Sequence, residues 1–101
     1  MDQFQDLPGW LHDLVRNVWE GPEWQAWERV WKPELAKRGV TPDMLEPFGD
    51  PRQPLAIEVR RPGMRSCSGK IDEADGRAAV LEALLQLVRD LDEAGAESRG
   101  P

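Results

Sequence analysis

Hydrophobic residues recur at helical spacing near the N-terminus of the chain. Between residues 7 and 19 they fall three or four positions apart, and polar residues occupy the other side of the same helical wheel. Pro8 suits a first helical turn and Gly21 with Pro22 stops a helix, so the pattern predicts a helix over about 8–20. Its hydrophobic positions are Leu7, Trp10, Leu11, Leu14, Val15, Val18 and Trp19.

A second hydrophobic stripe follows, made largely of tryptophan. Trp24, Trp27, Trp31 and Leu35 stand at i, i+3, i+7 and i+11, which places them on one face of a helix that finishes at Gly39. Each buried tryptophan removes roughly 150–250 Å² from water. We therefore expect at least two of the three tryptophans in the core, and the alternative is an aromatic anchor for a partner.

Pro33 interrupts this second helix. Proline has no amide hydrogen and its ring crowds the preceding turn. The helix is therefore expected to kink at Pro33, or to end near Lys32 and restart.

The middle of the chain changes from helical to strand-like patterning. Thr41 followed by Pro42 predicts a short helix over 42–46, and the proline-rich segment after it reads as a loop. Residues 55–59 then alternate apolar and polar side chains, and 64–71 return, which is typical of a β-hairpin.

The apolar positions of this hairpin favour one register. A three-residue loop over 62–64 pairs Val59 with Cys67 and Leu55 with Ile71, and it places all four on one face. A two-residue turn would leave Cys67 facing away from the apolar side. We therefore prefer the first register.

The last predicted element is a long helix from Asp72 to about Ala94. Its hydrophobic residues cover about half of its circumference, more than the stripe of about 100° that one packing surface needs. These residues form two rows, or seams, along the helix. One seam can pack within the domain while the other contacts a second copy of the chain in a homodimer. The alternative is a helix wedged centrally into its own domain. The seam assigned to a homodimer contact consists of Val80, Leu84, Leu87 and Leu91.

These elements predict a single α+β domain over residues 7–94. It has two N-terminal helices and a short third, a two-stranded antiparallel hairpin and a long C-terminal helix. A chain of 101 residues is one domain by size. Residues 1–6 and 95–101 are polar or rich in small residues, so we expect flexible ends there.

Charge is unevenly distributed along this acidic chain, whose net charge is -6. The segment 51–70 carries a positive excess, because its only acidic residue is Glu58. Such a segment is a candidate contact for an anionic partner, and the alternative is that it pairs with the acidic helices of the same chain. Its basic residues are Arg52, Arg60, Arg61, Arg65 and Lys70.

Residues able to carry catalysis or hold a metal are few. Cys67 is the only cysteine and His12 the only histidine, and no metal, nucleotide or nucleophile motif is present. We expect no catalytic residues, no metal and no cofactor, and therefore not an enzyme. The chain has no apolar run long enough to span a membrane and no secretory signal, which predicts a cytoplasmic protein without membrane contact.

A stretch of the second and third predicted helices resembles the helix-turn-helix spacing. Gly39 stands four residues after Leu35, and the aliphatic residue Leu45 stands six residues after Gly39. With the basic hairpin and long last helix, the order resembles a winged helix-turn-helix with a C-terminal dimerisation helix. That resemblance implies a hairpin that touches phosphates and a third helix that reads the major groove. Here residues 42–46 offer Asp43 and Glu46 but no Arg, Asn or Gln to read bases.

Two main hypotheses for the function follow from these patterns, and a third is an enzyme that uses carboxylates and a bound metal. The first is a small, tryptophan-rich, non-enzymatic regulatory protein that binds a protein partner through the basic hairpin and an aromatic surface. Its expected contact residues are Arg60, Arg61 and Arg65, together with Trp19, which lies at the edge of the first helix's apolar arc. The alternative is a winged-helix DNA-binding transcriptional regulator.

Overall fold

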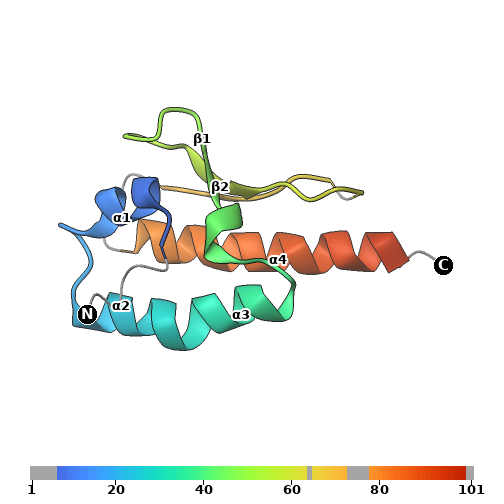
Figure 1. Ribbon diagram of the computed structural model, residues 1–101, viewed down its shortest axis with the longest axis horizontal. Coiled ribbons are helices and arrows are strands. Elements are labelled where there is room, and N and C mark those ends of the chain that lie inside the picture. The colour runs from blue at the N-terminus through green and yellow to red at the C-terminus, as the bar shows by residue number, and fades with distance from the viewer. Residues whose placement is uncertain (1–6, 64, 73–77, 100–101) are drawn as a thin grey trace.

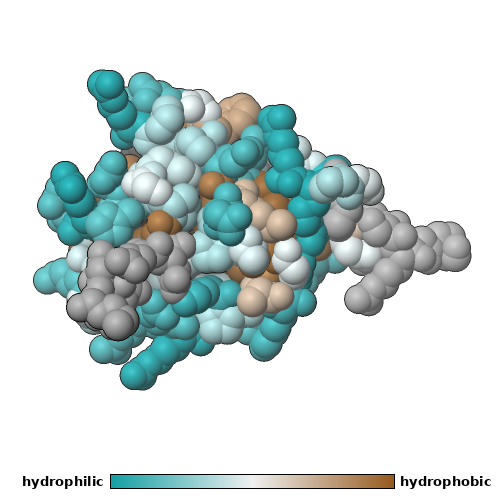
Figure 2. Space-filling view, viewed as in Figure 1, coloured by the Kyte–Doolittle hydropathy of each residue, from teal (hydrophilic) through white to brown (hydrophobic). Residues whose placement is uncertain are grey.

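Three layers are stacked in the structure, with the long C-terminal helix α4 (Ala79–Arg99) in the middle. A computed structural model describes residues 7–63, 65–72 and 78–99. A helical layer lies on one side of α4 and an antiparallel sheet on the other (Figure 1). This arrangement confirms the predicted α+β class. Hydrophilic side chains cover most of the face of the molecule that Figure 2 shows.

Helix α1 (Gly9–Val15) is shorter than the predicted 8–20. The chain turns after Val15, whose carbonyl accepts a hydrogen bond from the Trp19 backbone N–H at 2.8 Å. This turn directs Trp19 inward, where its ring meets Trp24 edge-on at 5.0 Å between centroids. Trp19 is 4% exposed, so its expected role as a contact for a partner, which needs an exposed side chain, is wrong.

The second helix runs without a break through α2 (Gly21–Ala26), a π-helical turn (Trp27–Trp31) and α3 (Lys32–Lys37). Pro33 explains the π turn, because it has no N–H to donate to the carbonyl four residues earlier. The backbone N–H of Lys32 instead reaches back five residues to the carbonyl of Trp27. The predicted interruption is thus a widened turn just before Pro33, through which the helix continues.

This π turn changes which side chains of the tryptophan stripe face the core. An α-helix advances about 100° per residue, so eight residues would rotate Leu35 about 80° away from Trp27. One extra residue in the π turn brings these two side chains close to the same face. Trp27 and Leu35 are fully buried, while Trp24 and Trp31 are partly buried against the core. One of the three tryptophans is therefore buried completely, and two flank it.

Helix α3 ends in a left-handed glycine, and a strand follows soon after. Gly39 has φ of 76°, and the two hydrogen bonds around it form the Schellman arrangement. The short helix predicted over 42–46 is a single 3-10 turn (Pro42–Met44). Strand β1 (Glu46–Phe48) then lies inside the segment that the sequence predicted as a loop. The chain therefore has no α-helix where a winged-helix protein places its reading helix.

The three strands pair antiparallel in the order β1–β2–β3, where β2 is Ala56–Val59 and β3 is Cys67–Lys70. The preferred hairpin register is confirmed, since Val59 pairs with Cys67. The backbone N–H of Ile71 also donates to the carbonyl of Leu55 at 2.9 Å. The third strand, β1, was not predicted.

Strand β3 lies almost in backbone contact with α4 at Gly69. A Cβ placed on this glycine would lie 1.7 Å from the carbonyl oxygen of Ala83 and 2.9 Å from the backbone nitrogen of Leu87. Only a residue without a side chain permits this approach. Gly69 therefore sets the distance between the sheet and the central helix.

Both edges of the sheet are closed to a further strand. Side chains of α4 accept the outward N–H groups of β3, because Asp90 binds the N–H of Ser68 and Gln86 binds the N–H of Lys70, each at 3.1 Å. At the other edge, β1 has three residues and Pro47 at its centre, which has no N–H to offer. The face of the sheet away from α4 is what remains open.

Helix α4 packs on both neighbouring layers, which explains its wide apolar arc. The seam assigned to a homodimer fills the protein's own core, as the alternative interpretation expected. The helix begins at Ala79 and ends at Arg99, beyond the predicted end near Ala94. The predicted start at Asp72 is wrong, because Asp72 is not helical; residues 73–77, and the residues 1–6 that were expected to be flexible, lie outside the described residues. The buried seam residues are Val80, Leu84, Leu87 and Leu91.

Candidate interaction surface

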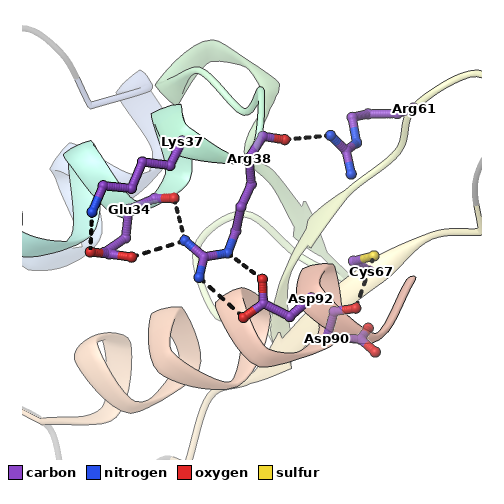
Figure 3. Close-up of polar contacts among 7 residues, drawn as sticks. All are labelled: Glu34, Lys37, Arg38, Arg61, Cys67, Asp90 and Asp92. Carbon is purple, nitrogen blue, oxygen red and sulfur yellow. Dashed lines mark hydrogen bonds and ion pairs between the residues drawn. The ribbon is translucent and has the colours of Figure 1, made fainter. Parts of the chain in front are cut away.

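Two of the three hairpin arginines are bonded to the protein's own helical layers. The Nη1 of Arg61 donates to the backbone carbonyl of Arg38 at 2.6 Å (Figure 3). The Nη2 of Arg65 donates to Asp90 of α4 at 2.7 Å. The two arginines thus diverge to different layers. This part of the basic segment satisfies the protein's own acceptors.

Arg38 joins α3, α4 and the hairpin in one network (Figure 3). Its Nε and Nη2 donate to the two carboxylate oxygens of Asp92 at 2.7 and 3.1 Å. Its Nη1 donates to the carbonyl and the carboxylate of Glu34 at 2.7 and 2.9 Å, and Lys37 donates to the same carboxylate. The backbone carbonyl of Arg38 accepts the hydrogen bond from Arg61, so Arg38 links α3, α4 and the hairpin.

These contacts lower the pKa values of three carboxyl groups. The hydrogen bonds from Arg38 hold the pKa of Asp92 below its usual value. Hydrogen bonds from Arg38 and then Lys37 lower the pKa of Glu34. For Asp90, the hydrogen bond from Arg65 is the largest cause, and burial partly opposes it. Each group is therefore better stabilised as a carboxylate in the folded chain than in the unfolded chain.

We expect acid to destabilise the fold through this network. A carboxyl whose folded pKa is lowered stabilises the protein fully above its unfolded value of about 4, and this contribution is lost as the pH falls through the folded pKa. Melting temperatures measured by circular dichroism from neutral pH down to about pH 3 should decline less steeply for Arg38→Gln than for the unchanged chain. Equal declines of the melting temperature with pH in the two proteins would contradict this prediction. Added salt should reduce the difference between the two declines.

Cys67 is a buried structural residue. The residue is 1% exposed, and its Sγ lies 3.8 Å from the carbonyl of Asp90 (Figure 3). The carbonyl of Arg65 lies 3.7 Å from the same Sγ. Among the described residues, no group of three or more His, Cys, Asp or Glu is placed to hold a metal ion.

The open face of the sheet carries the largest exposed hydrophobic side chains near a hollow. Phe48 is 50% exposed and Leu55 is 57% exposed. With Ala56, Ile71 and Lys70 they border a hollow of about 360 Å³, and we call these five residues the sheet-face patch. Isolated exposed apolar residues are common, whereas several together beside a hollow make this face a candidate interaction surface.

A second hollow of about 350 Å³ adjoins the first. Ile71 lines both of them, and we call these two neighbouring hollows together the groove. The second hollow is walled by Leu14 in α1 and Val18 after it, by Pro54 in the loop before β2, and by Ala79 and Val80 at the start of α4. Arg52 is the only charged residue in its lining among the described part of the chain.

The charged groups around this groove differ in how they are paired. Arg60 binds the carboxylate of Glu58 at 3.1 Å, so each largely neutralises the other. The side chains of Arg52 and Lys70 make no ion pair within residues 7–63, 65–72 and 78–99, although the backbone N–H of each residue donates a hydrogen bond. Each hollow is thus bordered by one cation whose charge is uncompensated.

The four predicted contact residues are divided by the fold. Arg60 lies beside the sheet-face patch on the outer side of β2, as its ion pair with Glu58 shows. Arg61 and Arg65 are bonded to other layers, and Trp19 is in the core. Sequence reasoning missed Phe48 because it falls in a proline-rich segment that reads as a loop, and it placed Leu55 and Ile71 on the apolar face of the hairpin.

Comparison with protein-family models, with curated proteins and with solved structures found no match to this chain. Within the described residues, no helix combines the length and the apolar character that crossing a membrane requires.

Proposed function

We propose that this protein is a non-enzymatic, cytoplasmic regulatory module that binds another protein on the open face of its sheet. The observation that carries the proposal is the sheet-face patch, with Phe48 and Leu55 half exposed or more beside a hollow. A hydrophobic centre with a polar rim is the usual anatomy of a protein-binding site. Arg60 supplies part of that rim.

The pairing of the remaining chemistry supports binding over catalysis. The thiol of Cys67 is buried, and the carboxylates of Asp90 and Asp92 are bonded to arginines in a structural network. A catalytic acid or base needs a pKa moved toward the working pH, whereas these carboxyl groups have lowered pKa values. This thiol and these carboxylates therefore stabilise the fold.

No observation favours the winged-helix alternative. It requires a helix able to enter the major groove, and the chain has the 3-10 turn Pro42–Met44 at that place. Its phosphate contacts would come from the hairpin, where Arg61 and Arg65 are already bonded within the protein.

We expect Leu55→Gln to abolish partner capture without loss of stability. The side chain is 57% exposed, so the free energy of unfolding should change by about 0.5 kcal/mol or less. Truncation at the centre of an interface typically weakens affinity at least tenfold, about 1.4 kcal/mol or more. Affinity capture from the source cell, followed by titration of the captured protein, measures both effects.

Val30→Gln is the matched control for this experiment. Val30 is also an exposed aliphatic residue, at 44%, but it lies in the π turn of the helical layer on the other side of α4. The control should capture the same protein as the unchanged chain. Capture that survives Leu55→Gln, or that is lost equally with Val30→Gln, would refute the proposed surface.

A further inference from the structure

We propose that the segment bound on this surface is an acidic amphipathic helix of the partner protein. The proposal rests on the proposed function and adds the chemistry and conformation of the ligand. Three features of the described residues carry it: two adjoining apolar hollows, two uncompensated cations beside them, and closed sheet edges.

The hollows select hydrophobic side chains at two positions of the ligand. They have volumes of about 350 and 360 Å³ and a mainly apolar surface, and Ile71 lines both. A single hydrophobic anchor would fill one hollow and leave the other in water. Two anchors on one face of the ligand, a turn or two apart, would bury both.

The cations select acidic residues beside those anchors. In the basic segment 51–70, Arg61 and Arg65 are bonded internally and Arg60 is paired with Glu58. The positive charge left without a partner is that of Arg52 and Lys70, one beside each hollow. Carboxylates placed there gain charge-assisted hydrogen bonds, and Glu58, the one acidic residue in the two linings as described, is already paired with Arg60.

The closed edges select a helix over an extended strand. A bound strand would normally add to a sheet edge, but Asp90 and Gln86 already accept the free N–H groups of β3. On the other side, Pro47 has no N–H to offer. A ligand lying on the face of the sheet must satisfy its own backbone hydrogen bonds, and an α-helix does so internally.

Selection from a phage-displayed library of random peptides about 15 residues long, four helical turns, tests the proposal. The full chain is immobilised as the target. Peptides that also bind the Leu55→Gln variant are removed by counter-selection. We expect hydrophobic residues at i, i+3 or i+4 and i+7, flanked by Asp and Glu, and helical circular dichroism when the synthetic peptide is bound. Raising the salt concentration should weaken binding.

Charge reversal separates a specific contact from general attraction. Arg52→Glu and Lys70→Glu should each weaken the selected peptide at least tenfold, by loss of attraction and gain of repulsion. Arg29→Glu is the control, because it makes the same charge change at an exposed position in the helical layer. A peptide with lysine in place of the matching acidic residue should recover affinity for Lys70→Glu.

The outcomes distinguish the inference from the function on which it rests. Selected peptides that depend on Leu55 but are neutral, basic or extended would overturn the acidic helix and leave the binding surface standing. Equal effects of Arg29→Glu and Lys70→Glu would overturn the charge contact in the same way. A selection that yields no peptide dependent on Leu55 would overturn both.

Discussion

Replacing Gly69 by alanine is expected to lower the free energy of unfolding by on the order of 3 kcal/mol or more. The added Cβ would lie 1.7 Å from the carbonyl oxygen of Ala83, which belongs to the backbone of α4. A side chain could rotate away from such a clash, but a helical carbonyl cannot. The strand β3 must therefore separate from α4, and the packing of the inner sheet face is lost with it.

Gly95→Ala is the matched control for this substitution. Gly95 lies within α4 and nothing approaches the place of its Cβ within 4 Å. Alanine there should raise stability by about 0.5–1 kcal/mol, since glycine weakens a helix interior. Urea denaturation followed by tryptophan fluorescence measures both variants. A midpoint for Gly69→Ala within error of the unchanged chain would show that β3 and α4 are further apart than described.

Trp27→Ala is expected to cost about 3–5 kcal/mol of the free energy of unfolding. Trp27 has the largest of the fully buried side chains and lies on the helix face turned to the core by the π turn. Truncation leaves a cavity that the three surrounding layers cannot close, because Leu35 and Leu84 are themselves held in the core. Urea denaturation followed by circular dichroism gives the loss directly.

Trp27→Phe should cost less than half as much as Trp27→Ala. The indole Nε1 of Trp27 is buried with no hydrogen-bond partner among the described residues, so phenylalanine removes volume and also an unsatisfied donor. Trp31→Ala is the comparison, because Trp31 is only partly buried, and its loss should be the smaller of the two alanine variants. Equal losses at Trp27 and Trp31 would contradict the assigned orientation of the helix.

The sequence predicted those parts of the fold that follow from local pattern. Alternation of apolar residues fixed the pairing of Val59 with Cys67, and a half-apolar circumference allowed the central position of α4. Strand β1 was missed because it has three residues with a proline at its centre, too short for a periodic signal. Trp19 was misplaced because α1 ends at Val15 and a turn follows, which apolar spacing alone does not reveal.

The candidate surface was only partly predictable for a different reason. Segment 51–70 was correctly recognised as basic, but pairing decides which of its charges face a partner. Arg61 binds a carbonyl 23 residues away and Arg65 a carboxylate 25 residues away, and no local pattern encodes such distances. Leu55 was expected to be buried beside Ile71, yet it lies largely exposed at the end of β2. Tertiary contacts therefore moved the candidate site from the hairpin tip to the sheet face.

Closed sheet edges also bear on how this protein behaves when it is crowded. Cross-β assembly begins when a free strand edge accepts a strand from another molecule. In the described part of this chain, side chains of α4 accept the outward N–H groups of one sheet edge. The other edge is a three-residue strand whose central proline has no N–H. The net charge of -6 adds repulsion between copies. A small, tryptophan-rich protein is thereby kept from polymerising through its own sheet.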